Sequence, residues 1–109
     1  MALVIASAAA PSTTHAADNE PHCADDAREH AVKLLALHVD DSGLRSGIDK
    51  SVTRAPSIHN PAYPKQKLDV LAIDGWVYKS RYRMRFIYAP MPDDECVLVG
   101  QEILEFAKF

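Results

Sequence analysis

The sequence predicts an α+β domain in which one N-terminal helix packs on a three- to four-stranded antiparallel meander sheet, with a single disulfide between the two layers. Residues 23–39 carry apolar side chains at helical spacing, and residues from 68 onward alternate between apolar and polar. The two cysteines lie far apart in the sequence. With 109 residues the chain is long enough for one domain and too short for two.

The helix is expected from Cys23 to Val39, with Gly43 as a natural stop beyond it. Asp25 and Asp26 fall in its first turns, where the helix dipole favours negative charge. One face of the helix is broadly apolar, as a helix covering a sheet requires. That face comprises Ala24, Ala27, Ala31, Leu34, Leu35 and His38.

Three strands are expected in the C-terminal part. Leu68 to Ile73 forms the first strand, Asp74-Gly75 is a two-residue hairpin signal, and Trp76 to Ala89 forms the second strand. Residues 90–94 form the next loop, and Glu95 to Phe106 forms the third strand. The second strand turns a series of apolar side chains toward the helix, namely Trp76, Tyr78, Tyr82, Met84, Phe86 and Tyr88.

The strand register can be predicted from the same alternation. Pairing Tyr88 with Cys96 keeps one face apolar across the second and third strands, and it brings Cys96 to the face where the helix packs. Asp69 falls on that inner face, opposite Ser80. The register therefore agrees with a disulfide from Cys96 to Cys23 at the helix start.

Residues 1–17 indicate export. They contain no Asp, Glu, Lys or Arg, their apolar run resembles that of a signal peptide, and small residues allow cleavage after Ala16 or Ala17. The run is too short to span a bilayer. A Cys23–Cys96 disulfide fits an oxidising compartment. We therefore expect a periplasmic or secreted protein with residues 18–109 as its single domain. The alternative to a signal peptide is a disordered Ala-rich tail on a cytosolic protein, and the alternative to the disulfide is two unpaired buried thiols.

Four cationic side chains occupy every second position along part of the second strand and project from its outer face. The simpler interpretation is a solvated face neutralised by carboxylates such as Glu105. The functional interpretation is a binding surface for another protein or an anionic envelope component. The expected register leaves three of the arginines without a carboxylate directly across, and aliphatic neighbours favour a protein interface. The candidate binding residues are Lys79, Arg81, Arg83, Arg85, Val99 and Ile103.

Several classes of function lack support. The net charge of -3 argues against general affinity for nucleic acid. No Gly-x-Ser-x-Gly elbow, HExxH or CxxC motif is present, so we expect no enzyme, cofactor or metal site. His22, Asp26 and His30 form an i, i+4, i+8 row, but nothing in the sequence identifies further ligands, and surface roles are expected for them.

The segment 42–65 is too long for an ordinary connection, so it carries either structure or function. A short strand around Lys50 to Arg54 fits part of it. The predicted architecture is similar to the cystatin-like architecture of small periplasmic binding and inhibitor domains, a likeness of fold that does not fix function.

The sequence thus favours a small exported, non-enzymatic binding protein that uses the outer sheet face and the 42–65 segment. Inhibition or neutralisation of an envelope enzyme or toxin is a specific form of this hypothesis. One alternative is a carrier of a small apolar ligand, with a pocket between the helix and the aromatic residues of the sheet. The other is an enzyme whose site lies in the 42–65 loop.

Overall fold

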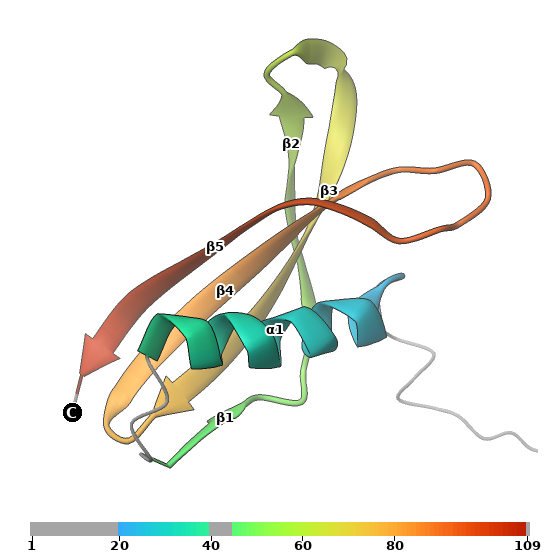
Figure 1. Cartoon of the computed structure of the whole chain (residues 1–109). Coiled ribbons are helices and arrows are strands. Elements are labelled where there is room, and N and C mark those ends of the chain that lie inside the picture. The colour runs from blue at the N-terminus through green and yellow to red at the C-terminus, as the bar shows by residue number, and fades with distance from the viewer. Residues whose placement is uncertain (1–19, 40–44, 109) are drawn as a thin grey trace, which may run out of the picture.

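The computed structural model describes residues 20–39 and 45–108 as one helix packed on a five-stranded antiparallel sheet that does not close into a barrel (Figure 1). The predicted α+β class and the single disulfide are confirmed. The expectations for the signal peptide at 1–17 and for the helix stop at Gly43 lie outside the described residues.

Helix α1 (Ala24–Val39) forms where the apolar spacing predicts it. Its buried residues are mostly small, which lets the helix axis approach the sheet closely, and Leu35 completes the contact. The core beneath the helix is filled by the largest fully buried side chains of the described chain, which are Phe86, Leu71, Ile73 and Met84.

The sheet contains the strands β1 (Ser46–Ile48), β2 (Thr53–Asn60), β3 (Tyr63–Val77), β4 (Ser80–Ala89) and β5 (Val97–Lys108). Four of them lie side by side in the order β1-β3-β4-β5, and β2 also pairs with β3. Strand β3 is the long central strand, to which both earlier strands are hydrogen-bonded.

The predicted hairpin turn at Asp74-Gly75 is wrong. Strand β3 continues through both residues, and the turn lies at Tyr78-Lys79, between the paired residues Val77 and Ser80. Gly75 serves packing instead, because a Cβ atom there would lie 3.0 Å from Met84 Cε and 3.3 Å from a Leu35 methyl carbon. Tyr78 accepts the left-handed backbone conformation of the turn, with φ of 53°. The prediction that Trp76 and Tyr78 lie on the inner face is therefore wrong. Tyr78 is exposed, and Trp76 pairs with the outer-face residue Arg81.

The predicted register between the last two strands is also wrong. Tyr88 pairs with Leu98, not with Cys96, and Met84 pairs with Ile103. Two register shifts, between Arg81 and Tyr82 and between Ile87 and Tyr88, insert extra residues into the pairing. A single shift exchanges which residues of β5 point inward, so alternation alone could not place them.

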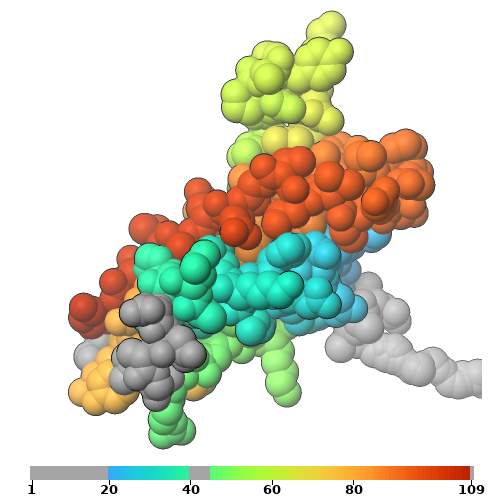
Figure 2. Space-filling view, in the orientation of Figure 1, coloured from blue at the N-terminus to red at the C-terminus, as the bar shows by residue number. Residues whose placement is uncertain are grey.

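The 42–65 segment carries structure rather than a plain loop. Strand β1 and all of β2 lie in its described part, and β2 begins at Thr53, near the short strand expected around 50–54. Strands β2 and β3 continue beyond the helix-covered body as a projecting hairpin (Figures 1 and 2). We call residues 56–66 of this hairpin the arm.

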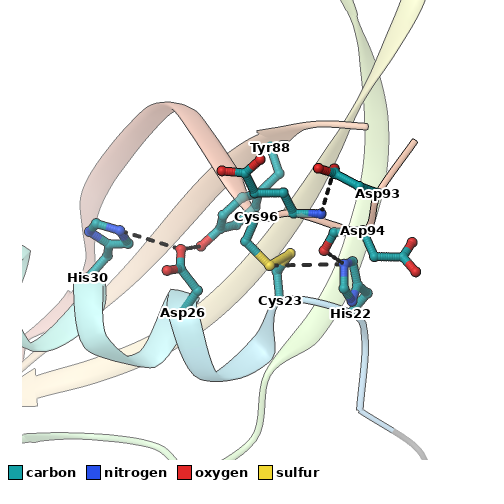
Figure 3. The surroundings of a disulfide bond; sticks show 9 residues. His22, Cys23, Asp26, His30, Tyr88, Asp93, Asp94 and Cys96 are labelled. Atoms are coloured by element: carbon teal, nitrogen blue, oxygen red, sulfur yellow. Dashed lines mark hydrogen bonds and ion pairs between the residues drawn. A yellow bond between two sulfur atoms is a disulfide. The ribbon is translucent and has the colours of Figure 1, made fainter. Parts of the chain in front are cut away.

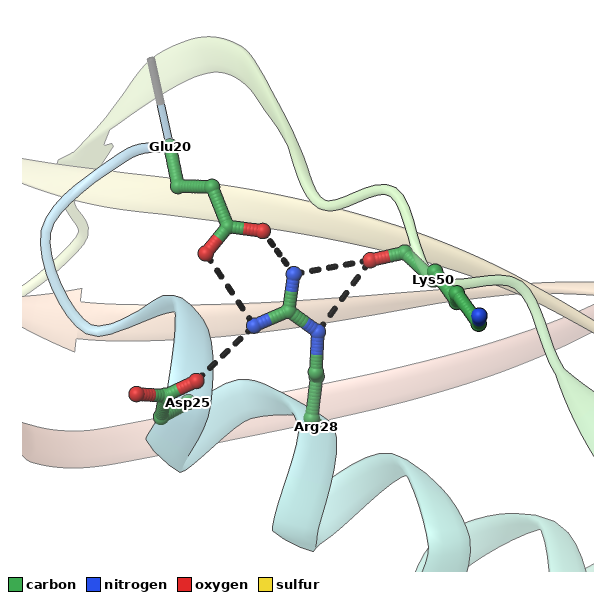
Figure 4. Close-up of polar contacts among 4 residues, drawn as sticks. All are labelled: Glu20, Asp25, Arg28 and Lys50. Atoms are coloured by element: carbon green, nitrogen blue, oxygen red, sulfur yellow. Dashed lines mark hydrogen bonds and ion pairs between the residues drawn. The ribbon is translucent and has the colours of Figure 1, made fainter. Parts of the chain in front are cut away.

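Two polar clusters fix the start of α1 to the rest of the fold. The guanidinium of Arg28 donates to the backbone carbonyl of Lys50 at 2.7 and 3.1 Å, and it also pairs with Glu20 and Asp25 (Figure 4). On the other side the hydroxyl of Tyr88 donates to an Asp26 carboxylate oxygen at 2.8 Å (Figure 3). Burial and this hydrogen bond raise the pKa of Tyr88, so the hydroxyl stays protonated and donating.

Candidate binding face

The candidate site is the outer face of the sheet, the side turned away from α1. Alternation along β4 places Tyr82, Met84 and Phe86 in the core and the three arginines that alternate with them on the opposite side. Within residues 20–39 and 45–108, α1 is the only helix, and it covers only the inner face (Figure 1). Val70 and Ala72 of β3 are buried on this face, whereas Arg83 and Leu104 are exposed there.

Arg83 is held on this face by contacts with two neighbouring strands. Its Nε and Nη2 atoms donate to the two carboxylate oxygens of Asp74 at 2.8 and 3.0 Å, across the β3–β4 pair. Its guanidinium carbon also lies 4.9 Å from the centre of the Phe106 ring. The hydrogen bond from Arg83 holds the pKa of the Asp74 carboxyl below its ordinary value, against the opposing effect of partial burial.

Its neighbours are paired as well. Arg85 donates to Glu102 at 2.9 Å across the β4–β5 pair, and Arg81 lies 3.5 Å from an Asp49 carboxylate oxygen. The expectation that Arg83 and Arg85 lack a carboxylate directly across is wrong: the misplaced turn hid Asp74, and the wrong register hid Glu102. Arg81 lies across from Trp76 and Ala107, and it reaches Asp49 instead. Lys79 lies in the β3–β4 turn, with its Nζ 5.5 Å from the centre of the Tyr78 ring.

A hollow of about 370 Å³ opens on this face between β2, β3 and β4. The small side chains of Ala55 and Ala72 contribute to its lining, and so do the long side chains of Arg83 and Arg85. Carboxylates and hydroxyl groups complete the lining, from Asp49, Asp74, Ser51 and Thr53. The hollow thus presents guanidinium N–H donors, acceptors and apolar carbon together.

Apolar side chains extend the face along β5. Leu104, opposite Arg83, is 58% exposed, and Phe106 is 46% exposed. Val99 is exposed as well, but it lies where the register shift leaves it unpaired. Ile103 pairs with the buried Met84 and packs against the core, so the structure does not bring it to the outer face.

The arm adds a second exposed surface. Tyr63 near its tip is 70% exposed, and Ile58 is 41% exposed. Its tip is held by local hydrogen bonds: His59 Nδ1 bonds the Pro64 carbonyl, and Asn60 both accepts from Ala62 N and donates to Gln66. An open hollow of about 580 Å³ is lined by residues 63–66.

The other predicted groups are not brought together in one site. His22 precedes the helix and bonds the Asp94 carbonyl, whereas His30 Nε2 lies 3.4 Å from Asp26, so the predicted row is divided (Figure 3). Asp69 pairs with Tyr88 rather than Ser80, and its carboxylate lies 3.9 Å from Arg54.

The missed residues have two origins. Asp74 is predicted in a turn, and pairing Tyr88 with Cys96 implies that Glu102 and Leu104 face inward, so neither prediction brings these residues to the arginines. The signal for Asp74 is present in the sequence: a two-residue turn at 78–79 places it directly opposite Arg83.

Comparison of the chain with protein-family models, with curated proteins and with solved structures finds no match. Within residues 20–39 and 45–108, no helix is long and apolar enough to cross a membrane.

Proposed function

We propose that this chain is a small exported, non-enzymatic binding protein that engages another protein through the outer sheet face. The observation that carries the proposal is the composition of that face: an open hollow lined by two held arginines, bordered by exposed Leu104 and Phe106. Arginine and aromatic side chains are enriched in protein interfaces, where a few of them supply most of the binding energy.

The ion pairs favour a protein over an anionic polymer as the partner. Arg81, Arg83 and Arg85 each have a carboxylate within 3.5 Å, so the face carries little net positive charge. A polyanion is attracted mainly by uncompensated charge. A held guanidinium still has unused N–H donors and loses little conformational freedom on binding, which suits a shaped protein surface.

The filled core favours this function over the carrier of an apolar ligand. Phe86 and Met84 are 0% exposed and occupy the space beneath α1. Of the aromatic residues proposed to line a ligand pocket, Trp76 and Tyr78 lie elsewhere. The carrier hypothesis needs that space to be empty.

The arm supports the same proposal as a second contact. An exposed Tyr on a hairpin stiffened by its own hydrogen bonds presents a large apolar area at low entropic cost. Insertion of the arm into a cleft of an envelope enzyme or toxin is the mode of inhibition that this geometry suits.

Retention of a partner from an envelope extract tests the proposal. The immobilised domain is compared with an Arg85→Glu variant, which reverses charge beside the hollow, and with Lys33→Glu, a matched reversal on the exposed side of α1. A Tyr63→Ser variant tests the arm, and Leu37→Ser, at an 80% exposed helix position, is its control. Each retained protein is identified and its affinity for the four variants is measured.

We expect Arg85→Glu to abolish retention and Lys33→Glu to leave it unchanged, because like charges across an interface repel. The fold should survive, since an exposed ion pair contributes about 0–1 kcal/mol. Equal retention of the partner by the Arg85→Glu and Lys33→Glu variants would show that the outer face is not the binding surface. Loss of retention in Leu37→Ser alone would place the binding surface on the exposed side of α1.

A further inference from the structure

The disulfide lies in an unusual setting. His22 immediately precedes Cys23, and its Nε2 atom lies 4.0 Å from Cys96 Sγ (Figure 3). The donor atoms of His22, Cys23 and Cys96 all lie within 4.8 Å of one another. His22 is exposed, and the two cysteines are half-buried, so the group can be reached from solvent.

We propose that, when the disulfide is reduced, His22, Cys23 and Cys96 bind a Zn²⁺ ion, so that disulfide formation and metal binding exclude one another. Two thiolates and one imidazole are a ligand set that Zn²⁺ accepts, with the fourth tetrahedral position left to water. Tetrahedral ligands at Zn–S of about 2.3 Å and Zn–N of about 2.0 Å lie roughly 3.5–3.8 Å apart. To reach such spacings the Cys23 and Cys96 sulfur atoms must move apart once the bond is reduced, and His22 Nε2, now 4.0 Å from Cys96 Sγ, must move slightly closer.

The two segments that carry these donors are held together by contacts other than the disulfide. One residue of the first helical turn, Asp26, accepts the hydrogen bond from Tyr88 at the end of β4. The loop before Cys96 is closed by bonds from Asp94 N to the Met91 carbonyl and from Glu95 N to Asp93. Reduction therefore leaves the two thiols close together, and only His22 must change its hydrogen-bond partner before the three ligands can meet the ion.

The chemistry balances with a dithiol as reductant. Two electrons and two protons pass from the dithiol to Cys23 and Cys96, the S–S bond breaks, and the dithiol becomes a disulfide. Zn²⁺ then displaces the two thiol protons and binds both thiolates. His22 must also change partner, because the nitrogen that faces Asp94 donates to its carbonyl in the disulfide form and carries a proton there.

Cobalt titration tests the proposal, with Co²⁺ as the spectroscopic substitute for Zn²⁺. The full chain is reduced anaerobically with a phosphine and titrated. Thiolate-to-cobalt charge transfer in the near ultraviolet and the visible bands of tetrahedral cobalt report the ligand set. The variants are His22→Ala and His59→Ala; the latter is a matched control, since His59 is also exposed and bonds a backbone carbonyl at 2.8 Å.

We expect one Co²⁺ per reduced chain, no thiolate band in the oxidised protein, and unchanged affinity in His59→Ala. His22→Ala should bind more than about tenfold more weakly, since the loss of an outer-shell partner alone costs that much. Absence of the thiolate band in the reduced chain, or equal affinity in His22→Ala, would overturn the proposal.

Thermal melting keeps the test decisive if the reduced chain is poorly folded. Zn²⁺ should restore much of the melting temperature that reduction removes, because it reconnects the same two segments. The restoration should be smaller in His22→Ala than in His59→Ala. A reduced chain that Zn²⁺ neither stabilises nor refolds contradicts the assignment.

Discussion

Removal of the disulfide should cost this domain a large part of its stability. The bond joins residues 73 positions apart, from the residue before α1 to the residue before β5. In the chain-entropy treatment a loop of that length lowers the entropy of the unfolded chain by about 15 cal/mol/K, or about 4 kcal/mol at 25 °C. Measured losses for small secreted domains are about 2–5 kcal/mol, against a total stability of about 5–15 kcal/mol.

The perturbation is the double variant Cys23→Ala/Cys96→Ala, which adds no polar group at these half-buried positions. Its melting temperature should fall by about 10–30 °C, since each kcal/mol shifts a domain of this size by about 4–8 °C. Urea titration followed by circular dichroism and by the fluorescence of Trp76, the single tryptophan, gives the free energy of unfolding. A loss below about 1 kcal/mol would refute the reasoning, because the covalent loop would then not constrain the unfolded chain.

Three further predictions concern single residues. Tyr78→Gly should raise stability by up to about 1 kcal/mol, because the left-handed conformation costs an L-residue about 1–2 kcal/mol, whereas glycine loses only about 0.5–1 kcal/mol more entropy on folding; a variant less stable than the wild type in urea would contradict the turn at 78–79. Tyr88→Phe should lower stability by about 1–2 kcal/mol through loss of the bond to Asp26, and an unchanged midpoint would show that the bond is not needed. The folded-state pKa of Asp74 lies below its unfolded value, so its stabilisation is present above about pH 4 and is lost as pH falls through the folded pKa. Asp74→Asn should therefore be less stable than the wild type at pH 7, by about 0–1 kcal/mol, and should differ less at pH 2; an equal difference at both pH values would contradict the ion pair with Arg83.

The parts of the fold that depend on simple periodicity were predictable. The apolar spacing from Ala24 to Leu35 defines the helix, and the alternation from Tyr82 to Tyr88 defines the inner face of β4. The disulfide followed from two cysteines placed at the ends of elements that pack together. Each of these inferences tolerates an error of one residue.

Register does not tolerate such an error. Gly75 was interpreted as a turn residue because Asp-Gly favours turns, but its lack of a side chain admits Met84 and Leu35 instead. The register shifts around Arg81 and Ile87 have no compositional signature, since each depends on how β5 twists against β4. The arginine row was therefore found, and its partners Asp74 and Glu102 were not.

The site prediction has the same division. Arg81, Arg83 and Arg85 lie on the outer face as expected, because their alternation with core residues is local to one strand. Ile103 and Leu104 exchange faces relative to the expectation, because their placement depends on pairing between strands. The hollow combines residues of three strands, so sequence alternation alone could not reveal it.

Hydrogen exchange with the captured partner bound tests the central claim most directly. The proposed interface lies on the outer face of β4 and β5 and on the arm, away from the exposed side of α1. Upon binding, amides of β5 around residues 102–106 and of the arm should gain protection, while those of α1 should exchange at unchanged rates. Protection confined to α1, with β5 and the arm unaffected, would contradict the account.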